Sequence, residues 1–157
     1  MLLLSVDAGT TKSAYVVVDT VDYRIISSGK VDNDELMQII KNEYYDDIVF
    51  EMISSYMNRI GDSTIQTIKW IGRFEQQVYI NGDIPKEMKR YEVKTELCGS
   101  MKAKDKDIIM YLEMRFGKKT KAKDSWFAGI TADQWQAYGL AIAWVDKQRE
   151  SEKDAIQ

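Results

Sequence analysis

The chain has 157 residues, of which 45% are hydrophobic and 30% charged, with a formal net charge of −3. This composition is typical of one soluble domain, and no stretch approaches the ~20 apolar residues that a membrane span needs. The absence of histidine excludes Ser-His triads and the commonest zinc sites, and the single cysteine excludes an intrachain disulfide. We therefore expect a cytoplasmic protein whose chemistry uses carboxylates, lysines, tyrosines and oxygen-ligated metals.

The first nineteen residues predict a β-hairpin with an acid at its tip. An apolar run from Leu2 to Val6 ends in Asp7, and a second run, Val16 to Val18, follows the turn Ala8-Gly9-Thr10-Thr11. A buried carboxylate is costly unless it is paired or binds a metal. Asp7 therefore indicates a site for a cation or a phosphate.

The sequence from Asp7 to Thr11 has three explanations. It resembles the phosphate loop of sugar kinases, actin and Hsp70-type ATPases, and equally the first strand of ribonuclease-H-like nucleases; a turn that merely needs Gly and Thr is the third. Those ATPases clamp nucleotide between two lobes, whereas 157 residues make roughly one domain. Length therefore favours the nuclease.

Strands and helices alternate along the rest of the chain, which predicts an α/β sandwich. Gly72 lies inside a predicted helix, where it costs about 1 kcal/mol relative to Ala, so we expect another backbone to pack closely there. The expected elements are a strand at 24–28, a helix at 33–43, a strand at 47–51, a helix from Ser63 (capping box with Gln66) to about Gln76, a helix from Asp105 to Phe116 stopped by Gly117, and a helix opening at Thr131 (capping box with Gln134).

Three carboxylates share one predicted environment. Glu51 ends a strand as Asp7 does, and Asp133 lies four residues before Ala137, on the apolar face of the last helix, so we expect it to point to the sheet and not to solvent. If the two strands are parallel neighbours, the three acids converge and need a cation such as Mg²⁺. Singly, they have plainer explanations as a turn former, a surface glutamate and an N-terminal helix acid.

Positive charge is concentrated between Ile84 and Lys123, where twelve Lys/Arg face six Asp/Glu. The remainder of the chain therefore carries nine net negative charges. A local basic band can bind a phosphate backbone whatever the charge of the whole chain. A lysine-rich solvated surface is the alternative explanation.

In order and spacing, five segments resemble the RuvC-like Holliday junction resolvases of ribonuclease-H-like fold, especially the short phage-type members. The resemblance runs from residue 1 to about 145. The matching segments are Val6 to Thr11, Ile48 to Glu51, Val93-Lys94 with Leu97 to Ser100, Lys102 to Lys106, and Ala132-Asp133 with Ala137 to Ala141.

The resemblance implies a mixed central sheet, with an antiparallel hairpin plus parallel strands, flanked by helices. It implies hydrolysis of branched DNA such as four-way junctions by a homodimer, with two Mg²⁺ ions per site for which Mn²⁺ can substitute. The implied metal ligands are Asp7, Glu51, Asp133 and Gln136; Lys104 and Lys106 join the three acids as catalytic candidates; and the DNA contacts are Lys12, Tyr56, Lys94, Lys102, Lys104 and Lys106.

Gln136 departs from the family, which has a second aspartate at this position. Its carbonyl can bind a cation but adds no charge, so the alternative function is a ribonuclease-H-like domain that binds branched nucleic acid without cleaving it. Tyr56 and Met57 are candidate wedges into an opened junction. We expect one nuclease domain at 1–148, a flexible charged tail at 149–157, no membrane association, and a dimer interface on the helix at 63–76.

Overall fold

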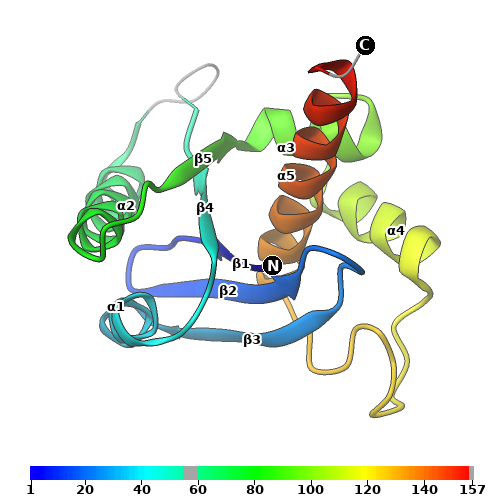
Figure 1. The fold of residues 1–157 in the computed structure, drawn as a ribbon, viewed down its shortest axis with the longest axis horizontal. Coiled ribbons are helices and arrows are strands. Elements are labelled where there is room, and N and C mark those ends of the chain that lie inside the picture. The colour runs from blue at the N-terminus through cyan, green and yellow to red at the C-terminus, as the bar shows by residue number, and fades with distance from the viewer. Residues whose placement is uncertain (55–59, 156–157) are drawn as a thin grey trace.

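The computed structural model describes residues 1–54 and 60–155, in which one five-stranded sheet lies between two layers of helices (Figure 1). The strand order is β3-β2-β1-β4-β5. β1 is antiparallel to β2, and β2 to β3, whereas β1, β4 and β5 are parallel. The expected mixed sheet is confirmed. The strands are β1 Leu2–Asp7, β2 Lys12–Asp19, β3 Ile25–Asp32, β4 Asp47–Met52 and β5 Lys86–Lys89.

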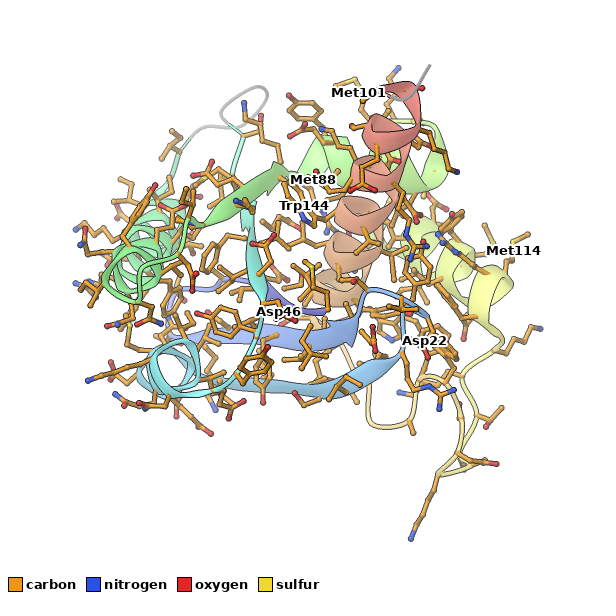
Figure 2. The ribbon with its side chains drawn as sticks, in the orientation of Figure 1. Asp22, Asp46, Met88, Met101, Met114 and Trp144 are labelled. Atoms are coloured by element: carbon orange, nitrogen blue, oxygen red, sulfur yellow. The ribbon has the colours of Figure 1, made fainter. Side chains whose placement is uncertain are left out.

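The helices divide between the two faces of the sheet, as Figure 1 shows. Side chains alternate along a strand, so Leu4 and Val6 of β1 pack under α1 and α2, whereas Leu3 packs under α5. Met88 of β5 and Trp144 of α5 belong to the same side as Leu3 (Figure 2). The helices are α1 Asn33–Asn42, α2 Asp62–Ile80, α3 Arg90–Cys98, α4 Asp105–Phe116 and α5 Gln134–Ala155.

The helix predicted to start at Ser63 differs from the observed α2. α2 begins at Asp62 behind Gly61 without a side-chain cap and continues to Ile80, so the capping box of Ser63 and Gln66 is wrong. Among the described atoms, nothing lies within 4 Å of a Cβ placed on Gly72, so the expected close backbone is absent from the described residues. The glycine is simply tolerated on an exposed face.

The last helix starts later than predicted. Residues 131–133 form a turn in which the Thr131 N–H donates to Oε1 of Gln134 at 2.9 Å, and α5 begins at Gln134. Residues 149–155, expected as a tail, continue α5, and Arg149 donates to the Tyr23 hydroxyl and the Thr20 carbonyl. No helix in the described ranges is long and apolar enough to cross a membrane.

Two carboxyl groups meet between α2 and β5. Burial, followed by the neighbouring carboxyl group of Glu87, raises the pKa of Glu75 from its ordinary 4.5 to about 7. The folded state therefore keeps a proton that the unfolded chain loses near pH 4.5. Stability should fall as pH rises from about 4.5 to about 7, because the unfolded state binds fewer protons in this window.

Glu75→Gln is expected to remove this loss of stability. At pH 8, the free energy of unfolding of the variant should exceed that of the parent by about 1 kcal/mol, after discounting for solvent screening. At pH 4.5 the two free energies should differ little, because Glu75 of the folded parent is then neutral. Thermal unfolding at both pH values measures the difference. Glu152→Gln on the exposed end of α5 is the control. A stability gain independent of pH would contradict the assignment.

Candidate active site

Three parallel strands end at one edge of the sheet. Val6 of β1 lies opposite Phe50 of β4, so Asp7 and Glu51 come next on neighbouring strands. On the other side of β4, Glu51 pairs with Met88, and Arg90 directly follows the end of β5. The pairing therefore brings two predicted acids and one arginine to the same edge.

The start of α5 is fixed over this edge by a buried hydrogen bond. The Ser5 hydroxyl of β1 donates to the Ala137 carbonyl at 2.8 Å. Asp7 lies two residues beyond Ser5 on the same side of β1, because side chains alternate along a strand. This contact places the N-terminal end of α5, with Asp133 and Gln136, beside the strand that carries Asp7.

Asp7 is an acid surrounded by other acids. Its pKa is raised to about 7, first by burial and then by the charge of Glu51; Asp133 and Asp105 add to the rise, and Arg90 opposes it. Within the described residues, no hydrogen bond or ion pair is made by the Asp7 carboxylate. It therefore lies in an excess of negative charge without a direct counter-cation.

Arg90 joins four elements at this site. Its Nη1 donates to Oε2 of Glu51 at 2.9 Å, and its Nη2 donates to Oε1 of Gln136 at 2.5 Å and to Asp105. The side chains of Arg90 and Glu51 are only 22% and 15% exposed. Burial raises the pKa of Glu51, and Arg90 opposes that rise. The arginine is thus the direct counter-ion of Glu51.

Asp133 lies immediately before α5 and not in its first turn. It pairs with Lys30 of β3, and the two side chains are 49% and 45% exposed. The prediction that Asp133 points away from solvent is therefore wrong, because the turn at 131–133 leaves it at the rim. Lys30 lies opposite Ala14, which lies opposite Asp7, so the three residues form one row across the sheet.

The three carboxylates are neighbours but do not form a closed cluster. In residues 1–54 and 60–155, no three Asp, Glu, His or Cys side chains lie close enough together to hold a metal ion. Glu51 is instead paired with Arg90, and Asp133 with Lys30. The donor set still fits a divalent cation chemically, since carboxylate and amide oxygens are the ligands Mg²⁺ prefers and Asp7 lacks a counter-cation.

The turn after Asp7 is fixed by a partly buried polar network. The Gly9 N–H donates to Ser13 Oγ at 3.2 Å, Ser13 Oγ donates to Asn33 Oδ1 at 2.6 Å, and Asn33 Nδ2 donates to the Gly9 carbonyl at 3.0 Å. A Cβ on Gly9 would lie 2.2 Å from the Lys12 carbonyl oxygen. Only glycine fits this turn, which holds the backbone next to Asp7.

Comparisons with known proteins agree with this architecture. The sequence matches no family model and no curated protein. Its structure is similar to Thermus thermophilus RuvC, with 13% identity and a TM-score of 0.75 over 96% of this chain and 97% of that one. The chain has a RuvC-like fold. A second similar structure, T. thermophilus RuvC in complex with Holliday junction substrate, has 14% identity and a TM-score of 0.73 over 96% of each chain.

The fowlpox virus Holliday junction resolvase is also similar, with 14% identity and a TM-score of 0.55 over 94% of this chain and 99% of that one. The expected resemblance to RuvC-like resolvases is confirmed for the fold, across nearly the whole chain. At these identities the fold alone is shared, so the roles of individual residues depend on the geometry of the site.

The predicted lysines of this RuvC-like fold differ in what relates them to the site. The charge of Lys94 lowers the pKa of Glu51, which places it near the site, whereas Lys12 is exposed and 3.7 Å from Asp32. At the start of α4, the residue that contacts the site is Asp105, through Arg90. Lys102, Lys104 and Lys106 are exposed around it; Tyr56 and Met57 lie outside the described residues.

Proposed function

We propose that the chain is a metal-dependent endonuclease that resolves Holliday junctions or other branched DNA by paired nicks. The observation that carries the proposal is Asp7, an acid without a counter-cation at the strand edge where Glu51 and Asp133 are its neighbours. The RuvC-like fold supports the choice of substrate, since one of the similar structures is a complex with Holliday junction substrate. Such a substrate implies the cytoplasm of a bacterial or phage-infected cell.

In this proposal, Asp7, Glu51, Asp133 and the Gln136 carbonyl hold two Mg²⁺ or Mn²⁺ ions. Bound there, the ions supply activation of water and stabilisation of the leaving 3′-oxygen. The fixed turn at Gly9 presents Asp7 at the edge of the sheet. Lys94, Lys104 and Lys106 bind the DNA phosphates and orient the scissile strand.

A non-cleaving domain that binds branched nucleic acid is the second candidate. It is favoured by Gln136, which adds no charge to the site and accepts a hydrogen bond from Arg90. A nicking assay on a synthetic four-way junction with Mg²⁺ or Mn²⁺ separates the two candidates. Metal-dependent nicks at paired positions support the endonuclease; tight junction binding without nicks supports the second candidate.

Double replacement of Lys94 and Lys104 by alanine is expected to weaken junction binding. Each lost phosphate contact should reduce the slope of log affinity against log salt by about 0.9, because fewer counterions are released. Junction affinity measured at several salt concentrations gives the slope. Lys41→Ala with Lys153→Ala, on α1 and at the exposed end of α5, is the control of equal charge. An unchanged slope would mean that Lys94 and Lys104 belong to a solvated surface and do not contact DNA phosphates.

We also propose a homodimer whose interface includes α2. One face of α2 is buried, with Ile71 and Phe74, while Ile65 and Ile68 are 41% and 39% exposed on the rest of its surface. A second apolar face on one helix is typical of a contact between chains, and a two-fold dimer matches the symmetry of a four-way junction.

Ile65→Lys with Ile68→Lys is therefore expected to give monomers, because charge would be buried at the interface. Light scattering at micromolar concentration measures the mass, and the nicking assay should show that the two nicks are no longer paired. Ile26→Lys, at an exposed position on β3, is the control. A parent protein of 18.2 kDa with full paired nicking would refute the dimer.

A further inference from the structure

We propose that Arg90 is an internal counter-cation of the site, which a divalent ion must displace from Glu51 in order to bind. This inference rests on the proposed metal site. In the sequence, Arg90 is one of the twelve Lys and Arg residues between Ile84 and Lys123. Its position directly after β5, at the edge where β1 and β4 end, places it among the candidate ligands instead.

Arg90 engages the oxygens that a metal would need. Its two terminal nitrogens contact Oε2 of Glu51 and Oε1 of Gln136, both of them candidate ligands. A guanidinium is planar and donates along fixed directions, so these two oxygens are oriented toward Arg90. A metal ion and Arg90 therefore compete for the same two oxygens.

The competition is strong because the pair is buried. The side chains of Glu51 and Arg90 are 15% and 22% exposed, so water screens their attraction poorly. Leaving either charge without a partner would cost free energy. The second ion pair of the site, Lys30 with Asp133, is about half exposed and should be displaced easily. The two pairs thus differ in burial while carrying the same charge.

Asp105 can keep Arg90 paired after the arginine leaves Glu51. It pairs with Nη2 of Arg90, is largely exposed, and is not a candidate ligand. Arg90 can therefore release Glu51 and Gln136 while keeping one anionic partner at the rim of the site. A divalent ion would then replace the guanidinium at Glu51, and the charge of the carboxylate would stay compensated in both states.

The test compares Arg90→Gln with Lys30→Gln, which remove the same charge from the same site. Calorimetric titration with Mn²⁺ alone gives the affinity, and thermal unfolding with and without Mn²⁺ gives an independent measurement. Arg90→Gln is expected to bind Mn²⁺ about tenfold tighter than the parent, and Lys30→Gln less than about threefold tighter. Without metal, the melting temperature of Arg90→Gln should be lower than that of the parent. Mn²⁺ should reduce this difference in melting temperature.

Equal affinities of the parent and Arg90→Gln would overturn the proposal, as would an equal gain in both variants, which would reflect net charge alone. If Arg90→Gln does not fold, Arg90→Met fills the same space without charge and is expected to show the same gain. Glu51→Gln separates failure of the proposed metal site from failure of the proposed role of Arg90. If neither the parent, Arg90→Gln nor Glu51→Gln binds Mn²⁺, the proposed metal site itself fails; if the parent binds through Glu51 and Arg90→Gln binds equally, only the role of Arg90 fails.

Discussion

Replacing Asp7 by asparagine is expected to abolish nicking of a four-way junction while leaving junction binding intact or stronger. The change removes a metal-ligating charge, for which a loss of roughly a thousandfold or more in rate is expected. It also reduces the repulsion between the DNA phosphates and an edge of the sheet that already carries Glu51 and Asp133. Rate and affinity should therefore change in different ways.

Single-turnover nicking and equilibrium junction binding measure the two effects separately. Asp19→Asn makes the same chemical change at the end of β2, at the opposite edge of the sheet, and should leave both quantities near those of the parent. Nicking by Asp7→Asn at the parental rate would remove Asp7 from the chemistry and leave the proposed function without its main support.

Gly9→Ala is expected to have the largest effect on stability. The added Cβ would lie 2.2 Å from the Lys12 carbonyl oxygen, so the backbone of the turn must move. The movement would disturb the hydrogen bonds that join Gly9 to Ser13 and Asn33, both of which are buried. We expect the free energy of unfolding to fall by about 2 kcal/mol or more, with loss of nicking because Asp7 precedes the turn.

Denaturant unfolding gives the change in free energy. Gly61→Ala adds the same methyl group where nothing lies within 4 Å among the described atoms, and it should cost no more than about 1 kcal/mol. Equal stability of the two alanine variants would show that the turn relaxes around the methyl group and that glycine is not required there.

Apolar patterning was sufficient to predict the elements that build the core. β1 and β4 are continuous apolar runs, and α4 has the predicted bounds, because burial decides these segments. β5 gave no such signal, since Met88 is its only buried residue and the rest of the strand is charged. Its pairing with β4, and the helix α3 that follows, depend on contacts between distant segments.

Asp7 and Glu51 were predicted because a strand that ends in a carboxylate is unusual, and Asp133 because it lies four residues before Ala137 on an apolar helix face. Their counter-ions were not, because a lysine or arginine looks the same in sequence whether it faces solvent or an acid. Arg90 and Lys30 became identifiable only through the strand pairing that sets them beside Glu51 and Asp133. The sequence offered one hint. Met88 is the only apolar residue between Lys86 and Arg90, and Arg90 follows it by two positions.

The hydrogen bond from Ser5 to Ala137 joins the first strand to the last helix across 132 positions of the chain. During synthesis on the ribosome, β1 and β4 emerge long before α5, so Asp7 and Glu51 exist for a time without Asp133 and Gln136. The apolar face of the sheet that α5 covers stays bare over the same interval. A nascent chain therefore carries half of the ligand set on an unfinished core, and the proposed nuclease becomes competent only when its final helix docks.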